Sequence, residues 1–486
     1  MPSEDLAFAP AWQLANWIKG RQVSPVELVE TYLRRIERLN PTLNAFLTVC
    51  TDEALAGARQ AEARVMDGSP LGPLHGIPVP IKDLTPTAGI RTTHGSLILR
   101  DHVPHRDAPL VERLRKAGAI IIGKTNTPEF GHRGTTENLL GDACRNPWDT
   151  DRTSGGSSGG SAVAVACGLG AVAEGSDGGG SIRIPASLCG VYGIKPTRGR
   201  VARNYRGPGP WSTLPQNGAL SRSVRDSALL LQVMAGPHPD DPTSIQEAPP
   251  DFQVGLERGV AGLRMAWTPD WGTAAVDPES RALAESGARA FEALGAHVEE
   301  LDFVLDEEAV RATFVSMFLS DMDAAFGHFL DRNPDLLMPS LQRGLEEART
   351  WSAADLSRAL REMEWHRAVI RGLFQQYDLL LTPTTAVPAF PVEGWPDVIG
   401  GRPVDPLWGF NPFCYVFNMT GHPAASVPCG FARGMAQDAQ PGGGGATGLP
   451  VGMQIVGRLG EEATVLRASA AFEAARPWAQ VRPPVA

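Results

Sequence analysis

Three short segments carry side chains that could do nucleophilic and acid–base chemistry. The first, residues 75–83 (HGIPVPIKD), places Lys82 at the end of an apolar run. Most lysines are solvated surface charges, and the simplest alternative pairs Lys82 with Asp83. Burial would lower the lysine pKa by disfavouring the charged form, and a neutral amine can act as a base.

The other two segments are rich in glycine and serine. Residues 153–168 (TSGGSSGGSAVAVACG) could be a flexible linker, but they run directly into small apolar residues typical of a packed helix. Residues 174–190 (EGSDGGGSIRIPASLCG) contain consecutive glycines beside Ser181. Their exposed N–H groups would bind an anion, either a phosphate or an oxyanion. Neither segment has the lysine of a phosphate-binding P-loop, which favours an oxyanion hole.

In this order, the segments resemble the amidase signature family. The resemblance continues through four further motifs, at residues 123–130 (GKTNTPEF), 193–200 (GIKPTRGR), 420–428 (TGHPAASVP) and 448–457 (GLPVGMQIVG). It therefore covers nearly the whole chain. It implies that Lys82 is the general base, Ser157 is a bridging serine on a cis peptide and Ser181 is the nucleophile. It implies no cofactor and no metal.

The resemblance also assigns supporting roles. The oxyanion hole falls to the N–H groups of Gly178, Gly179 and Gly180, together with that of Ser181. A larger set would support the reacting groups: Ser158, Ser176, Asp177 and Arg183. Asp177 and Arg183 would brace the glycine loop. Ser158 would be structural, with a reversal of Ser157 and Ser158 as the alternative.

One position departs from the family pattern. Ser176 stands where the family usually has threonine, so the hydroxyl is kept. Serine is less restricted than threonine at its first side-chain torsion, so the hydroxyl would be held less rigidly.

Substrate choice must come from residues outside these motifs. Gly131 and Gly134 fall where the family places pocket residues, and small residues there would leave room. Candidate wall residues for an apolar or aromatic group are Trp211, Phe314, Phe318, Trp408, Phe410 and Tyr415. Each could equally be an ordinary core aromatic, although binding pockets are mostly apolar.

Two histidines leave a different mechanism open. His75 and His132 lie near the motifs, and a Ser-His-Asp triad could use one of them. The GxSxG pattern of such enzymes does not surround Ser181, and it fits the serine pair only because a Gly/Ser run matches it easily. A structural or pocket-lining role is favoured for both.

The resemblance predicts a serine hydrolase that cleaves carboxylic amide C–N bonds through an acyl-enzyme on Ser181. Esters, carbamates and urethanes stay open because they share this chemistry. The alternative is the glutamine-hydrolysing amidase component of a tRNA-dependent amidotransferase, although no match to its glutamine-pocket region stands out. A binding protein without activity is disfavoured, because the lysine and both serines are intact.

Composition and charge limit the classes of binding partner that we expect. The 486 residues carry a net charge of −10, which does not favour a nucleic-acid partner. The longest stretch without charged residues, 406–432, is broken by prolines, and the N-terminus lacks the basic region of a signal peptide. We expect a cytoplasmic monomer or homodimer acting on a small molecule, with no membrane association. The six scattered cysteines indicate free thiols.

Several elements must position these side chains. Apolar runs at 77–81 and 119–122 read as buried strands with a helix, 109–117, between them. This order predicts an α/β fold, a single large domain with a central mixed, largely parallel β-sheet covered by helices.

We expect one amidase domain over residues 1–486, without separate modules. Within it we predict N-terminal helices (1–70), the signature core (71–235), a helical substrate-shaping region (236–380) and the C-terminal part of the core (381–486), with a flexible loop at 432–447.

Overall fold

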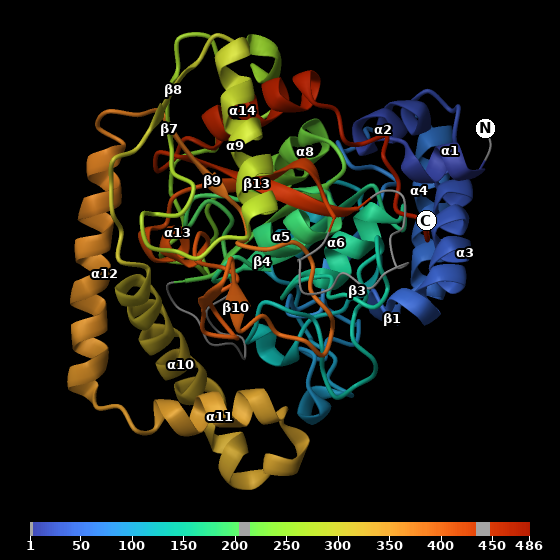
Figure 1. The fold of residues 1–486 in the computed structure, drawn as a ribbon. Helices are drawn as coiled ribbons and strands as arrows, with labels where there is room; N and C mark the ends of the chain where they lie inside the picture. Colours follow the sequence, from blue (N-terminus) through green and yellow to red (C-terminus); the bar gives the residue numbers. More distant parts are fainter. Residues whose placement is uncertain (1–2, 204–213, 434–447) are drawn as a thin grey trace.

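An eight-stranded sheet runs through the part of the chain described by this computed structural model, residues 3–203, 214–433 and 448–486 (Figure 1). Its strands, in spatial order, are β4 (Val172–Asp177), β6 (Gln216–Ser221), β5 (Tyr192–Lys195), β12 (Ala424–Ala432), β13 (Leu449–Gly457), β9 (Leu379–Pro383), β7 (Arg264–Trp267) and β8 (His297–Glu300). The predicted flexible loop falls almost entirely outside the described residues.

This sheet is mixed, as predicted, but it is not largely parallel. Five of its seven neighbouring pairs are antiparallel, and only β7 pairs in parallel, with β8 and β9. Strands β5 and β6, and likewise β12 and β13, follow each other along the chain and pair directly, which antiparallel geometry permits. The parallel pair β7–β8 has a crossover helix, as such pairs require.

The strands that suggested a parallel sheet form a separate, smaller one. It has the order β1 (Phe46–Val49), β3 (Ile120–Thr125) and β2 (Pro78–Lys82). Strands β2 and β3 are parallel and are joined through α5 (Pro109–Lys116), as the apolar runs predicted. A short two-stranded hairpin consists of β10 (Val398–Ile399) and β11 (Arg402–Pro403).

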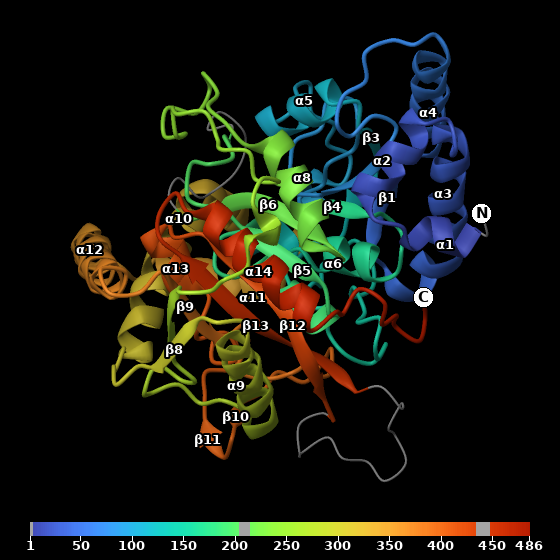
Figure 2. The same cartoon turned by 90° about the horizontal axis from the view of Figure 1, so that it is seen from above.

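Fourteen α-helices surround the sheets in the described residues. Beside α5 they are α1 (Ser3–Phe8), α2 (Ala11–Lys19), α3 (Pro25–Leu43), α4 (Thr51–Met66), α6 (Gly159–Ala166), α7 (Arg183–Cys189), α8 (Val224–Met234), α9 (Pro278–Ala293), α10 (Glu307–Arg332), α11 (Pro339–Ala348), α12 (Ala353–Leu373), α13 (Tyr415–Thr420) and α14 (Glu462–Ala475). Helices α1–α4 lie on one side of the molecule, and α10 and α12 on the opposite side (Figures 1 and 2). None of the described helices combines the length and apolar character that a membrane crossing needs.

The larger sheet separates two hydrophobic cores. Successive residues of a strand face opposite sides. In β9, Leu379 and Leu381 therefore join one core, with residues of α8, α9 and α14, and Leu380 joins the other, with residues of α10 to α13. All six cysteines are buried free thiols. The described residues form a single α/β domain; the predicted subdivision within it stays a prediction.

Candidate active site

Lys82 is the last residue of β2, and its side chain is completely buried. Its Nζ lies 2.7 Å from Ser157 Oγ, 3.0 Å from Ser176 Oγ and 3.1 Å from the Ser176 carbonyl oxygen. Burial lowers the pKa of Lys82 to about 7, although the carboxylates of Glu174 and Asp177 oppose the shift. An amine with this pKa is available in its neutral form near pH 7.

The Gly/Ser run is a tight turn into α6. A Cβ added to Gly156 would lie 2.3 Å from the carbonyl oxygen of Thr135, so only glycine fits there. The peptide bond between Gly156 and Ser157 is cis. Ser157 lines the cavity described below, whereas Ser158 does not, and the Ser158 hydroxyl donates to the Ser176 carbonyl oxygen at 3.0 Å. The turn therefore brings Ser157, and not its neighbour, to Lys82.

Ser181 lies between β4 and α7 and keeps 9% of its surface exposed. Within the described residues, its hydroxyl makes no hydrogen bond, and neither do the N–H groups of Gly178, Gly179 and Ser181. The Gly180 N–H instead donates to Asp177 Oδ1 at 2.8 Å. Gly180 thus lacks the free N–H that the sequence suggested, because the preceding aspartate turns back onto the glycine loop.

The glycine loop is braced by a buried ion pair. Arg183 donates to both carboxylate oxygens of Asp177, at 2.8 and 2.9 Å. Burial alone would raise the pKa of Asp177, but the guanidinium holds that pKa well below its usual range. Arg183 also bonds Asn418 Oδ1, Gln454 Oε1 and the Cys414 carbonyl. The predicted bracing positions of Asp177 and Arg183 therefore lie directly behind the loop.

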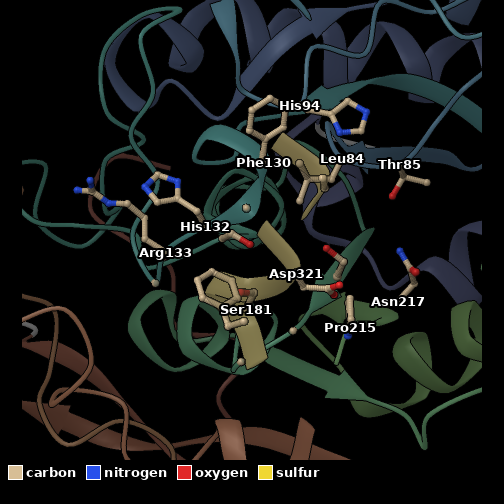
Figure 3. Close-up of a pocket in the computed structure, with 18 of the residues that line it drawn as sticks. Leu84, Thr85, His94, Phe130, His132, Arg133, Ser181, Pro215, Asn217 and Asp321 are labelled. Atoms are coloured by element: carbon tan, nitrogen blue, oxygen red, sulfur yellow. The ribbon is translucent and has the colours of Figure 1, made fainter. Parts of the chain in front are cut away.

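A cavity of about 420 Å³ opens onto Ser157, Ser176 and Ser181. His132 and Arg133 lie to one side of Ser181, and Pro215 and Asn217 to the other (Figure 3). Six of the suggested pocket residues line it: Gly131, Gly134, Phe314, Phe318, Trp408 and Phe410.

One suggested pocket residue of the described part of the chain, Tyr415, is not among those that line the cavity. Tyr415 lies behind Phe314, with ring centroids 5.2 Å apart, and its hydroxyl bonds to the Glu307 carboxylate. Helical position alone does not tell which ring faces the cavity and which lies in the layer behind. Trp211 lies outside the described residues.

One wall of the cavity is an aromatic cluster, Phe314, Phe318 and Trp408. The two phenylalanine rings stack at 5.6 Å, and Trp408 meets each edge-on at 5.5 Å. A Cβ on Gly179 would lie 2.6 Å from Phe314 Cζ, so this ring packs directly on the glycine loop. A Cβ on Gly131 would come within 3.3 Å of Ser157 Oγ, which explains the need for a small residue there.

Neither His75 nor His132 makes a hydrogen bond to Ser157 or Ser181. His75 Nε2 bonds a backbone carbonyl at 2.9 Å. His132 lines the cavity, but its Nδ1 bonds the Glu129 carbonyl and its Nε2 bonds Ser340 Oγ, both at 2.8 Å. Burial lowers the pKa of His132 to about 3. Both histidines hold backbone or neighbouring segments in place.

The sequence reasoning missed three polar residues around the site. The Asn411 amide donates to the Gly179 carbonyl at 2.7 Å and so orients the glycine loop. The Asn217 amide donates to Glu174 Oε1 at 2.7 Å. The available signal was Glu174 itself, the one charged residue in the short run AVAEG at residues 171–175.

Together, the fold and the buried lysine–serine cluster define a class, the amide hydrolases of amidase signature type. The family model described as Amidase matches residues 27–466, and the chain belongs to this family. An acylamidase of Rhodococcus erythropolis is 36% identical over 99% of this chain and 98% of its own. A glutamyl-tRNA(Gln) amidotransferase component of Moorella thermoacetica is 36% identical over 99% of both chains. Among solved structures, a bacterial aryl acylamidase of the amidase signature family has a TM-score of 0.89 at 33% identity, with 97% of each chain covered.

Proposed function

We propose that this amidase cleaves its substrate through an acyl-enzyme on Ser181, with Ser157 as proton relay and Lys82 as general base. The observation that carries the proposal is the 2.7 Å contact between Lys82 Nζ and Ser157 Oγ, at the inner end of a cavity that also reaches Ser181. A serine hydroxyl needs a base to become a good nucleophile, and the burial of Lys82 provides a neutral amine for that purpose.

An ammonium at Lys82 could donate to all three oxygens around it, and the same contacts also accommodate the neutral amine that the proposed mechanism requires. A neutral amine has two N–H donors and one lone pair. The Ser176 carbonyl can only accept, the Ser176 hydroxyl takes the second N–H, and the lone pair then faces the Ser157 hydroxyl. This arrangement supports proton transfer from Ser157 to Lys82.

In the proposed reaction, Ser157 passes its proton to Lys82 and takes the proton of Ser181 as Ser181 attacks the amide carbonyl. The oxyanion is bound by the N–H groups of Gly178, Gly179 and Ser181, and one such donor is worth about 3 kcal/mol. The C–N bond then breaks as the proton returns through Ser157 to the leaving nitrogen. Water hydrolyses the acyl-enzyme by the same relay in reverse.

The wall of Phe314, Phe318 and Trp408 supports amides with an apolar, aryl-sized group as substrates. Aromatic rings stack or meet edge-on with such groups. The similarity to an aryl acylamidase and an acylamidase agrees with this choice. Esters and carbamates of the same shape would react by the same acyl-enzyme chemistry.

A serine-directed fluorophosphonate tests the assignment. Ser181→Ala should abolish both labelling and amide turnover, because the attacking oxygen is gone. Ser158→Ala is the matched control, since Ser158 does not line the cavity, and this variant should still be labelled. Labelling that persists in Ser181→Ala would place the nucleophile elsewhere. A turnover panel of anilides, primary amides, esters, carbamates and glutamine then ranks the substrates.

The pH dependence provides a second test. The rate should rise with pH through about 7, because Lys82 must lose its proton to act as a base. A flat profile between about pH 6 and 9 would contradict a titrating lysine.

The similarity to glutamyl-tRNA(Gln) amidotransferase components favours a second candidate, glutamine hydrolysis for a partner enzyme. The aromatic wall is mostly apolar and suits an aryl group better than the amide side chain of glutamine, which ranks this candidate second. Strict dependence on glutamine, together with copurification of a partner, would reverse the order.

A further inference from the structure

We infer that Glu174 is a positioning residue of this site, which ties the strand of Lys82 to the neighbouring sheet and makes it easier for Lys82 to hold a proton. The inference rests on the proposed role of Lys82 as the base. Glu174 does not line the cavity, so it acts through Lys82 and not on the substrate.

The first argument is where Glu174 lies. Strand β2 is an edge of the three-stranded sheet, and β4 is an edge of the eight-stranded sheet. The two strands pack together but share no ladder of backbone hydrogen bonds. At this junction the Glu174 carboxylate accepts the backbone N–H of Lys82 at 3.0 Å. The Glu174 side chain thus accepts the Lys82 N–H in the way that a backbone carbonyl of a paired strand would.

The second argument is the set of groups around the carboxylate. Besides the Lys82 N–H, Glu174 accepts from the Thr85 hydroxyl at 3.0 Å and from the Asn217 amide at 2.7 Å. Burial raises the pKa of the Glu174 carboxyl, and the backbone N–H and the amide NH₂, which can only donate, oppose that shift and favour the ionised form. Thr85 and Asn217 both line the cavity, and Glu174 therefore links its wall to the strand of Lys82.

The third argument concerns the other charges around Lys82. Asp177, on the same strand β4, is neutralised by Arg183 of α7 through two hydrogen bonds. Glu174 has no such guanidinium among the described residues. Its carboxylate is the leading opposing influence on the pKa of Lys82, ahead of that of Asp177.

Two further charged side chains belong to or adjoin the sheet of β2: Lys124 of β3, and Asp83, which directly follows β2. Lys124 of β3 is buried and donates to the Thr85 carbonyl and to the Thr87 and Thr92 hydroxyls. Asp83 Oδ2 accepts the Thr93 N–H at 2.9 Å. Both groups are held by their own partners, so Glu174 is the anion whose removal acts most directly on Lys82.

The expected consequence follows from the sign of the interaction. Burial disfavours the ammonium form of Lys82, and a nearby carboxylate favours it. Without the charge of Glu174, Lys82 should lose its proton at lower pH and become a weaker base. Glu174 would thus balance burial, so that the amine is free near neutral pH and still basic enough to take a proton.

The test is the pH dependence of Ser181 labelling by a fluorophosphonate in Glu174→Gln, which keeps the size and removes the charge. The midpoint of the rising limb should move to lower pH by about 1 unit, and the plateau rate should fall. Glu174→Asp, which keeps the charge but shortens its reach, should shift the midpoint in the same direction by less. Either variant alone reports the effect if the other does not fold.

Glu473→Gln is the matched control. Glu473 of α14 also accepts a backbone N–H, that of Val224 at 3.1 Å, but it does not act on Lys82. The pH midpoint of Ser181 labelling in Glu473→Gln should equal the wild-type value. An unshifted midpoint in Glu174→Gln, or a shift to higher pH, would overturn the inference while leaving Lys82 as base. A wild-type profile without a rising limb, or Lys82→Met labelled at the wild-type rate, would instead overturn the proposed function.

Discussion

Strand β4 carries two buried carboxylates that meet their cations in different ways. Asp177 receives two hydrogen bonds from the guanidinium of Arg183, and both side chains are completely buried. Glu174 contacts Lys82 only through the backbone N–H, while the amine of Lys82 points to Ser157 and Ser176. One carboxylate of β4 therefore forms a closed ion pair with Arg183 of α7, and the other leaves the side chain of Lys82, on β2, to contact the two serines.

The comparison is between a cation that keeps its charge, Arg183, and a lysine that gains and loses a proton in the proposed mechanism, Lys82. Arginine stays protonated in proteins and forms rigid two-point contacts with carboxylates, which suits it to bracing a loop. Lysine changes its pKa readily when buried, which suits it to acid–base work. Replacing each cation by methionine should therefore have a different main effect: a loss of catalysis at Lys82 and a loss of stability at Arg183.

The largest expected effect is on catalysis at Lys82. Lys82→Met should lower kcat/KM for an anilide about 1,000-fold, because a general base contributes on the order of 10²–10⁴. Lys82→Arg should be about as inactive, since arginine keeps the positive charge but does not give up its proton. Steady-state kinetics measure both. Substantial activity in Lys82→Arg would mean that position 82 serves as a fixed cation, and the contrast with Arg183 would disappear.

The next effect is on stability at Arg183. Arg183→Met should lower the free energy of unfolding by about 3–5 kcal/mol, because it leaves the Asp177 carboxylate buried without its cation. Lys82→Met, the substitution that removes the other cation, should cost clearly less, since the pKa of about 7 leaves that amine largely neutral above pH 7. Urea denaturation compares the two variants. Equal losses would indicate that Lys82 is a structural cation as well.

The smallest effect should come from the aromatic wall, away from both pairs. Phe318→Ala should raise KM for an aryl amide about tenfold, because an apolar ring loses one stacking neighbour. The pH midpoint should stay at the wild-type value, since Phe318 belongs to the cavity wall and not to the charges around Lys82. A KM that does not change for aryl substrates would mean that the ring binds elsewhere, and a shifted midpoint would separate the pH dependence from Lys82.

The positions of Lys82, Ser157 and Ser181 could be predicted because short motifs fix them on or beside buried elements. Lys82 ends β2, Ser157 precedes α6 and Ser181 follows β4; Lys82 contacts Ser157 at 2.7 Å, and the two serines line one cavity. The role of each N–H in the glycine loop could not be predicted. Consecutive glycines do not reveal that the Asp177 carboxylate takes the N–H of Gly180.

The other differences between the sequence-based predictions and the structure come from packing between segments far apart in the chain. The prediction of a largely parallel sheet was drawn from β2 and β3, which are parallel but lie in the smaller sheet. Glu174 stands out in the sequence as the one charged residue of the run AVAEG, but its contacts depend on how the edges of the two sheets pack together. Tyr415 and Phe314 stack on each other, and only the tertiary structure decides which ring reaches the cavity.

The partners of Arg183 have a consequence for the order of events during synthesis. Its guanidinium binds Cys414, Asn418 and Gln454, all far along the chain from the loop that it braces. A ribosome releases the loop of Ser181 long before it releases those partners. A nascent chain that ends before Cys414 should therefore carry Lys82, Ser157 and Ser181 and still be unreactive toward a serine probe. Competence would be acquired only near the end of translation.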